Sequence, residues 1–399
     1  MNSVVRQMWE QNTDVVMVDT GNSYEGLCEY VGGKYISYTD EHPITMNPFA
    51  IKREELNIEK IGFLKNLIML IWKGTQGEVT KTEDRLVEQV ITEYFDEYFV
   101  KKRIDNLSFN TFYEYSTIRI PDIIRENNLA GIDLAAYNYL LKDFYKGGSH
   151  ELTLNENLDT KLFDETFIVF EIDSIKDDPL LFPLVTLIIM DVFIQKMRIK
   201  KNRKVLVIEE AWKAIASPMM AEYIKYLYKT ARKFWASVGV VTQEIQDIVG
   251  SPIVKEAIIN NSDVVMLLDQ AKFRERFDEI KAILGLTDVD CKKIFTINRL
   301  ENKEGRSFFR EVFIRRGSVG AVFGVEEPHE CYMTYTTERA EKEALKLYKK
   351  ELQCDHQHAI EAYCRDWELS GISKSLPFAQ KVNQTGHVLH LSPNNHSEQ

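Results

Sequence analysis

Residues 204–212, with the sequence KVLVIEEAW, constrain the fold of this chain more than any other segment. Four consecutive aliphatic residues precede Glu209 and Glu210. A short, wholly apolar run predicts a strand that is buried on both faces of a parallel sheet. Two carboxylates at its carboxyl end lie where open α/β sheets bind ligands. The pattern is typical of a Walker B element, in which one carboxylate holds Mg²⁺ through water and the next orients or deprotonates the attacking water.

Polar residues also end three other predicted strands. Because parallel strands bring their carboxyl ends to one edge of a sheet, we expect these residues to share a site. The alternative for the two glutamates is that they begin a helix, whose dipole favours negative charge at its amino end. The four predicted strand ends are Asp19, Glu209–Glu210, Thr242–Gln243 and Asp269–Gln270.

Two further side chains are candidates for nucleotide chemistry. Gln243 is suited to orienting a water molecule or sensing a γ-phosphate, and its alternative role is to cap the next helix. Arg232 lies eleven residues earlier, near the end of a predicted helix at residues 219–235. It could reach a neighbouring subunit's nucleotide as an arginine finger. From the sequence alone, a surface cation is the favoured interpretation of Arg232.

The sequence also lacks several features. It contains no G-x-x-x-x-G-K-[ST] loop. Its net charge of −11 argues against general nucleic-acid binding. We expect the basic segment at residues 196–204 to be a solvated helix end and turn. The five cysteines form no CxxC pair and the eight histidines show no metal-binding spacing, which indicates free thiols in a reducing, cytosolic setting.

The alternation of apolar strands and helices predicts an α/β fold, with a mostly parallel sheet covered by helices on both faces. An apolar run at residues 180–194 is too short and interrupted to span a membrane, so we expect a buried helix and no transmembrane segment. Residues 306–326 predict a hairpin, and roughly the last 25 residues are predicted to form a disordered tail. We expect the core at residues 1–51 and 161–352, an all-helical insertion at 52–160, and a C-terminal helix with its tail at 353–399.

Several motifs in this chain resemble those of one protein family. They are KVLVIEEAWKAIA, YLYKTARKFWASVGVVTQEIQDI, IINNSDVVMLLDQ, VDTGNSYEGLC and FIVFEID. Their order is similar to that in the C-terminal motor domain of conjugative-transfer, or type IV secretion, ATPases, and most similar to the TraG-like conjugative-transposon ATPases. The resemblance extends from residue 1 to about residue 350.

The resemblance implies a RecA-like P-loop NTPase core that binds ATP and Mg²⁺. By this resemblance Glu209 is the acidic residue on the metal side, and Glu210 is the catalytic carboxylate. Gln243 is the γ-phosphate sensor, and Arg232 is the arginine finger. Asp19 and Thr242 are expected to contact the nucleotide.

The family also implies a hexamer or other oligomer that works with other channel subunits at the cytoplasmic face of the inner membrane. DNA is a further, weakly supported partner. Family members carry a P-loop just before a helix that resembles residues 2–11, so the first strand and the phosphate cradle are missing here. We therefore expect a truncated chain that is inactive on its own.

Two alternatives to a secretion motor stay open. One is a DNA translocase of the FtsK/HerA kind on the same core, against which the acidic net charge argues mildly. The other is an assembly subunit that keeps the fold without catalysis, which the missing P-loop favours.

Overall fold

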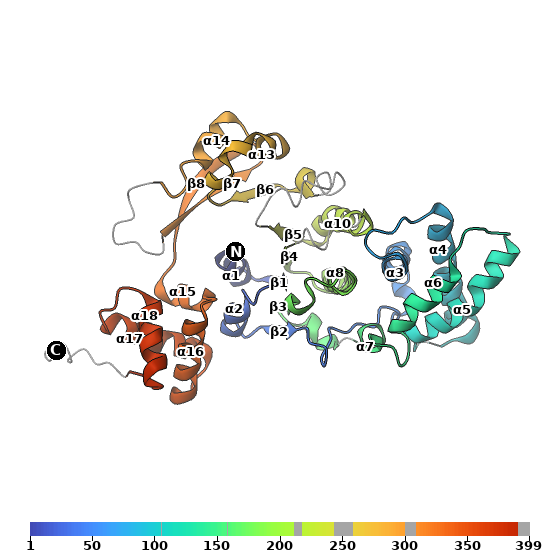
Figure 1. Cartoon of the computed structure of the whole chain (residues 1–399), viewed down its shortest axis with the longest axis horizontal. Helices are drawn as coiled ribbons and strands as arrows, with labels where there is room; N and C mark the ends of the chain where they lie inside the picture. The colour runs from blue at the N-terminus through green and yellow to red at the C-terminus, as the bar shows by residue number, and fades with distance from the viewer. Residues whose placement is uncertain (105, 158, 211–217, 243–257, 300–308, 390–399) are drawn as a thin grey trace. The chain divides into compact units, whose positions relative to one another are not determined.

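A computed structural model describes residues 1–399 except 105, 158, 211–217, 243–257, 300–308 and 390–399 (Figure 1). The chain forms two compact units, and we describe each by itself. The first unit contains residues 1–11, 22–35 and 259–399. The second unit contains residues 12–21 and 36–258.

The core of the second unit is a parallel sheet with the strand order β2-β3-β1-β4-β5. Strand β1 pairs in parallel with β3 on one side and with β4 on the other, and β4 pairs in parallel with β5. The apolar runs of β1 and β3 are buried along their whole length, as the sequence pattern predicts. Strand β5 forms one edge of the sheet and is only partly buried. The strands are β1 (Thr13–Asp19), β2 (Lys34–Ser37), β3 (Phe167–Glu171), β4 (Arg203–Glu209) and β5 (Ala236–Val241).

Two helices that flank β4 in the chain pack onto this core. Helix α8 (Leu181–Ile199) is buried nearly all round, which confirms the predicted buried helix. Helix α10 (Pro218–Ala231) contacts both α8 and β5. Within the described part of the chain, no helix has both the length and the apolar character needed to cross a membrane.

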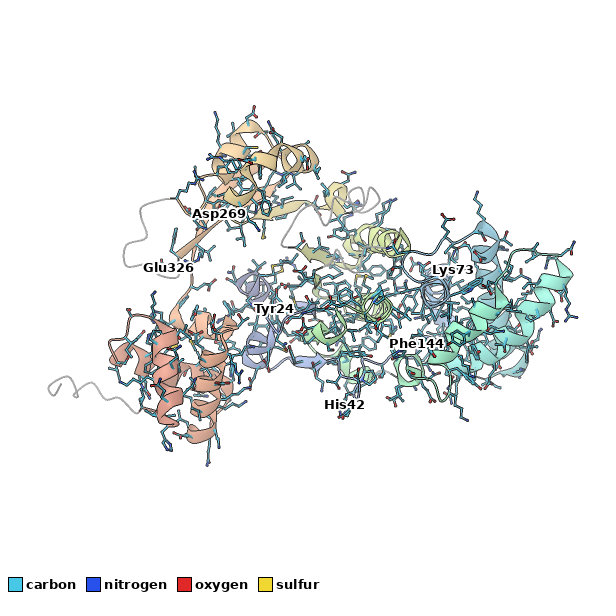
Figure 2. The ribbon with its side chains drawn as sticks, viewed as in Figure 1. Tyr24, His42, Lys73, Phe144, Asp269 and Glu326 are labelled. Carbon is cyan, nitrogen blue, oxygen red and sulfur yellow. The ribbon has the colours of Figure 1, made fainter. Side chains whose placement is uncertain are left out.

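The described elements between β2 and β3 are all helical, as expected for the predicted insertion. Their core is aromatic: Phe49 stacks on Phe112 with ring centroids 4.8 Å apart, and Phe144, labelled in Figure 2, is fully buried. The boundaries of this segment as a separate domain stay a prediction. The main helices are α3 (Ile58–Lys73), α4 (Lys81–Phe95), α5 (Phe109–Glu126), α6 (Leu134–Leu141) and α7 (Glu151–Asn155).

The first unit contains an antiparallel sheet in the order β6-β7-β8. Strands β7 (Phe309–Arg316) and β8 (Val319–Glu326) form the predicted hairpin, and Gly317 supplies the positive φ of +58° that its turn needs. Strand β6 (Val264–Leu267) pairs antiparallel with β7. Helix α14 (Asp288–Ile294) packs on β8, and α13 is Phe277–Leu284.

The placement of β6 corrects one prediction from the sequence. Residues 262–270 were expected to add a buried strand to the parallel sheet, with Asp269 and Gln270 at its edge. Instead β6 lies in the antiparallel sheet, and Val264 and Met266 are 43% and 44% exposed. A short apolar run specifies a strand but does not specify its partners, which is why the pattern misled.

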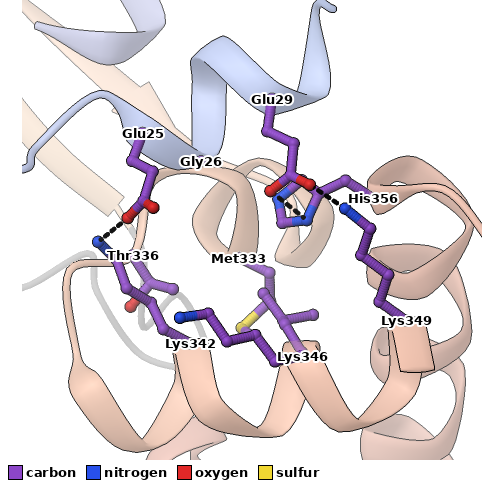
Figure 3. Close-up of a pocket in the computed structure, with 10 residues that line it drawn as sticks. Glu25, Gly26, Glu29, Met333, Thr336, Lys342, Lys346, Lys349 and His356 are labelled. Carbon is purple, nitrogen blue, oxygen red and sulfur yellow. Dashed lines mark hydrogen bonds and ion pairs between the residues drawn. The ribbon is translucent and has the colours of Figure 1, made fainter. Parts of the chain in front are cut away.

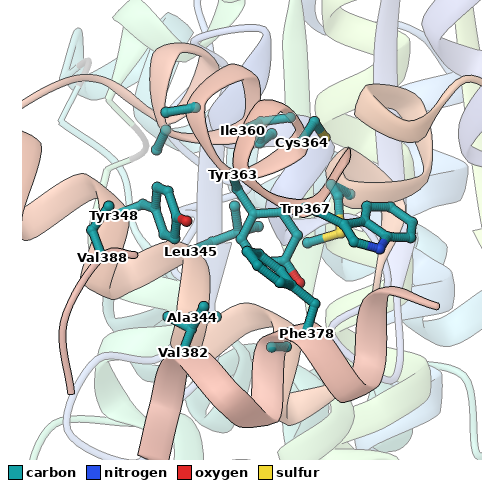
Figure 4. Packing of buried hydrophobic residues seen from close by; sticks show 14 residues of the cluster. Ala344, Leu345, Tyr348, Ile360, Tyr363, Cys364, Trp367, Phe378, Val382 and Val388 are labelled. Atoms are coloured by element: carbon teal, nitrogen blue, oxygen red, sulfur yellow. The ribbon is translucent and has the colours of Figure 1, made fainter. Parts of the chain in front are cut away.

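Four C-terminal helices of the first unit share an apolar core (Figure 4). Tyr348, Tyr363 and Phe378 are fully buried there, and the rings of Tyr363 and Phe378 lie 5.0 Å apart. Helix α18 falls within the segment expected to be a disordered tail, but Phe378 and Val382 anchor it in this core. The same unit includes α1 (Asn2–Glu10) and α2 (Glu25–Tyr30). The four helices are α15 (His329–Tyr335), α16 (Arg339–Leu352), α17 (His356–Leu369) and α18 (Ser375–Thr385).

Candidate functional site

Three adjacent strands of the parallel sheet end in carboxylates at the same edge. Asp19 on β1 pairs in register with Glu171 on β3. Glu209 follows Ile208, which pairs with Val18, so Glu209 lies beside Asp19 along the edge. Residues in register on neighbouring strands project from the same face, and the strands are about 4.8 Å apart. The sheet therefore gathers acidic side chains into one row.

The degree of burial differs along this row. Asp19 is fully buried, Glu171 is 3% exposed and Glu209 is partly exposed. Glu171 accepts a hydrogen bond from the backbone N–H of Asp173 at 2.8 Å, which fixes the turn after β3. Glu171 lies in the motif FIVFEID, which carries part of the family resemblance, but it is not among the site residues predicted from the sequence. A carboxylate directly after the apolar residues of a predicted parallel strand was the signal that could have identified it.

Glu210 has an unusual backbone conformation. Its φ is +48°, in the left-handed region that non-glycine residues seldom occupy. Such a residue costs about 1–2 kcal/mol, and strained residues of this kind cluster at functional sites. The chain therefore turns sharply after Glu209. The alternative that the two glutamates begin a helix concerns residues 211–217, which lie outside the described residues.

The remaining predicted site residues lie on or around β5. Thr242 directly follows Val241, which pairs with Glu209, so Thr242 lies at the same edge and is partly buried. Gln243 lies outside the described residues. Arg232 is exposed and begins a short 3-10 turn before β5, at the amino-terminal end of that strand. The structure therefore does not bring Arg232 to the carboxyl edge of its own sheet.

The carboxyl edge offers carboxylates that could bind Mg²⁺, but not a complete set of protein ligands. Among the described residues, no group of three or more His, Cys, Asp or Glu side chains could hold a metal ion. Mg²⁺ is usually bound through one or two carboxylates, and its other ligands are water and substrate phosphates. Asp19 and Glu209 provide carboxylates of this kind. The printed sequence has no phosphate-binding Walker A loop to complete the site.

The opposite, amino-terminal edge of the sheet holds buried cations. Lys196 of α8 is fully buried, and its Nζ lies 2.9 Å from a carboxylate oxygen of Asp14. Lys204 is 1% exposed and donates to the carbonyl of Phe234 at 3.0 Å, and burial lowers the pKa of its amine. The basic segment at residues 196–204 was expected to be solvated, and this prediction is wrong for its two end lysines. They have structural partners because an unpaired charge inside the protein would be costly.

Comparisons with known proteins support the resemblance seen in the sequence. The family described as "TraG P-loop domain" matches residues 1–367. Protein TraC of Escherichia coli K12 is 23% identical over 297 residues, which cover 69% of this chain and 31% of TraC. The chain therefore spans about a third of the length of that relative.

Solved structures support the fold. VirB4 of Thermoanaerobacter pseudethanolicus superposes with a TM-score of 0.59 at 19% identity, covering 82% of this chain and 85% of that one. The conjugative coupling protein TrwBΔN70 gives a TM-score of 0.50 at 12% identity, covering 82% and 81%. TrwB has also been solved with the ATP analogue ADPNP and with ADP and Mg²⁺. These likenesses confirm the predicted RecA-like α/β core, and the family match over residues 1–367 shows that the chain belongs to the TraG P-loop domain family.

Proposed function

We propose that this chain is part of an ATP-hydrolysing motor that powers pilus assembly or substrate transfer in conjugation. The observation that carries the proposal is the pair Glu209–Glu210 at the carboxyl end of β4, beside Asp19 on the neighbouring strand. This is the edge at which parallel α/β sheets bind ligands. The TrwB complexes with ADPNP and with ADP and Mg²⁺ support the choice of nucleotide and metal.

Each residue at the carboxyl edge has a distinct role in this proposal. Glu209 would hold a hydrated Mg²⁺, with Asp19 beside it to contact the nucleotide, and the ion would supply charge stabilisation to the phosphoryl group being transferred. Glu210 orients or deprotonates the attacking water, and its strained backbone fixes the position from which it does so. Thr242 contacts the nucleotide, and Gln243 is the proposed γ-phosphate sensor.

Arg232 is proposed to act on a neighbouring subunit. It is exposed at the amino-terminal end of β5, so it is available to a neighbour. An arginine finger supplied by another subunit stabilises the charge that develops in the transition state. This role requires an oligomer, and a hexamer at the cytoplasmic face of the inner membrane, together with other channel subunits, is the arrangement we propose.

The experiment compares ATP hydrolysis by two proteins. One is the chain as printed, and the other carries a strand and a G-x-x-x-x-G-K-[ST] loop joined ahead of α1. The loop supplies backbone N–H groups and a lysine for the phosphates. We expect hydrolysis from the second protein and little or none from the first.

The first prediction concerns Glu210→Gln in the protein that carries the loop. We expect ATP turnover to fall by at least about a hundredfold while the affinity for ATP stays within about twofold, because the base is lost but the phosphate contacts remain. Turnover is measured by phosphate release and affinity by titration with a fluorescent ATP analogue. Glu343→Gln, on an exposed part of α16, is the control and should leave both unchanged. Normal turnover in Glu210→Gln would remove this residue from the proposed mechanism.

A further inference from the structure

A cavity of about 140 Å³ lies in the first unit among helices α2, α15, α16 and α17 (Figure 3). Its walls include two acidic residues of α2, Glu25 and Glu29, and three lysines of α16. The three lysines, Lys342, Lys346 and Lys349, are four and three residues apart, so they share one face of α16. The proposed ATPase mechanism uses none of the residues that line this cavity.

The cavity is lined by more lysines than glutamates, so their charges do not cancel. Glu25 pairs with Lys342 at 3.2 Å, and Glu29 forms an ion pair with Lys349. Lys346 lies between these two pairs on α16 and forms no ion pair with any described residue (Figure 3). Three lysines against two glutamates leave one net positive charge. The middle position is therefore where an external anion gains most.

The floor of the cavity is apolar. Met333 and Leu345 are 1% and 4% exposed and line it from α15 and α16. Gly26 completes the wall on α2, and a Cβ added there would lie 2.5 Å from the carbonyl oxygen of Thr334. Glycine thus lets α2 approach α15 closely. An anion bound against such a floor is partly removed from water, which strengthens its attraction to the lysines.

A histidine supplies the second polar feature. His356 of α17 lines the cavity, and its Nδ1 lies 3.3 Å from Glu29. Its Nε2 is buried and makes no hydrogen bond within the described part of the chain. Burial lowers the pKa of this imidazole, and Lys349 lowers it further, although the carboxylates of Glu29, Glu25 and Asp355 act in the other direction. Because Nδ1 faces the Glu29 carboxylate, the neutral tautomer with its proton on Nδ1 presents Nε2 as a hydrogen-bond acceptor.

We propose that this cavity binds a phosphate group, either as inorganic phosphate or as a phosphate monoester. Its negative oxygens accept hydrogen bonds from the ammonium groups of Lys346 and Lys342, and a P–OH group donates to Nε2 of His356. Inorganic phosphate keeps a P–OH group as HPO₄²⁻ at neutral pH, whereas a monoester, whose second pKa is about 6, carries one only in its monoanionic form. A protonated phosphate combines both functions in one group. Sulfate at neutral pH carries the charge without the proton, and a simple carboxylate likewise has no O–H to donate.

Occupation of the cavity has a structural consequence. The ligand bridges α2 and α16, whose nearest lining residues in the sequence, Glu29 and Lys342, are 313 residues apart. A ligand that binds only the folded form stabilises it by RT ln(1 + [L]/Kd), where [L] is the free ligand concentration. Phosphate should therefore raise the unfolding temperature, by an amount that grows with the logarithm of its concentration above Kd.

The test is a titration of the whole chain with inorganic phosphate, glycerol 3-phosphate and sulfate at constant ionic strength. Binding is measured by calorimetry and by thermal unfolding. We expect saturable binding of inorganic phosphate, of glycerol 3-phosphate or of both, and the tighter of the two identifies the natural source. We expect sulfate to bind at least about threefold more weakly, because it leaves the imidazole acceptor unsatisfied.

Two variants locate the binding. Lys346→Gln should weaken phosphate binding by about tenfold, because it removes a charge-assisted hydrogen bond. Lys350→Gln is the matched control, since Lys350 is exposed on the same helix and does not line the cavity. His356→Gln should abolish the preference for phosphate over sulfate. Absence of saturable binding, or equal binding by Lys346→Gln and the unaltered chain, would overturn the proposal.

Discussion

Lys60 of α3 and Asp191 of α8 form an ion pair deep in the second unit. Their charged atoms lie 2.8 Å apart, and the side chains are only 8% and 5% exposed. Gln195 also donates to Asp191, at 2.7 Å, so this carboxylate has a second partner. The pair joins the helical segment to a helix that contacts β1, and it tolerates burial because each charge is matched.

Breaking this pair should be costly. We expect Asp191→Asn to lower the free energy of unfolding by about 3 kcal/mol, because Lys60 is left buried without a counter-charge. Urea denaturation followed by circular dichroism measures the change. Lys176→Met removes an exposed pair with Asp173 and should leave the free energy of unfolding nearly unchanged, because exposed ion pairs contribute little. If Asp191→Asn lowered the free energy of unfolding no more than the control does, the Lys60–Asp191 pair would not be buried in solution.

Replacement by alanine should change stability in opposite directions at two glycines. A Cβ at Gly26 would meet the carbonyl oxygen of Thr334 at 2.5 Å, so Gly26→Ala should destabilise the chain by about 1–3 kcal/mol. A Cβ at Gly62, inside α3, would meet nothing within 4 Å. Gly62→Ala should therefore stabilise by about 0.5–1 kcal/mol through helix propensity. Chemical denaturation of both variants gives the signs, and a stabilising Gly26→Ala would contradict the described contact between α2 and α15.

At the scale of single elements, the start of α4 is held by a reciprocal cap. Thr80 accepts from the N–H of Glu83 at 3.2 Å, and Glu83 accepts from the N–H of Thr80 at 3.0 Å. Lys73 forms an ion pair with the same carboxylate, whose side chain is only 3% exposed. Burial raises the pKa of Glu83, but the hydrogen bonds from Lys73 and Thr80 outweigh this and hold the pKa below its ordinary value.

The depressed pKa fixes how this cap responds to acid. A carboxyl with a lowered folded pKa contributes stability above its unfolded pKa of about 4.3, and that stability is lost as the pH falls through the folded value. We expect Glu83→Gln to cost about 1 kcal/mol at pH 7, and this difference should shrink towards zero as the pH falls below the unfolded pKa and through the lowered folded pKa of Glu83. Denaturant unfolding over a pH series measures it. Glu78→Gln, at an exposed position before the cap, should show no such pH-dependent gap.

The sequence was sufficient where a pattern has one physical interpretation. The apolar runs of β1, β3 and β4 require burial on two faces, and α8 is apolar around its circumference, so all four were predictable. The neighbour of each strand in its sheet was harder to predict. The apolar run of β6 specifies a strand, but it does not specify the antiparallel pairing with β7.

The residues at the candidate site also differed in whether the sequence could predict them. Asp19 and Glu209 were predictable from their positions at the ends of apolar strands, and the register places them side by side. Glu171 was missed because its strand was not considered for chemistry. The burial of Lys196 and Lys204 could not be foreseen, since their compensating partners, including Asp14, are distant in the sequence.

At the scale of the whole molecule, charge argues against a DNA pump. The chain carries a net charge of −11. Most cations of the basic segment at residues 196–204 already have partners within the chain. Two of its lysines are buried, and Arg198 and Lys200 form ion pairs with Glu59 and Asp164. Affinity for nucleic acid comes mainly from cations that displace counterions from phosphates, and few cations of this segment are available for that.

We therefore expect weak binding of duplex DNA with a shallow salt dependence. The slope of log K against log salt should be about −2 or smaller in magnitude, because each phosphate contact contributes about −0.9. Fluorescence anisotropy with a labelled duplex at several salt concentrations measures it. The double variant Lys201→Gln, Arg203→Gln removes the two exposed cations of the basic segment that have no described ion pair, and it should reduce the remaining slope further. A slope of about −6 or steeper would instead require an extended phosphate-binding surface elsewhere on the chain, and would favour the translocase over the secretion motor.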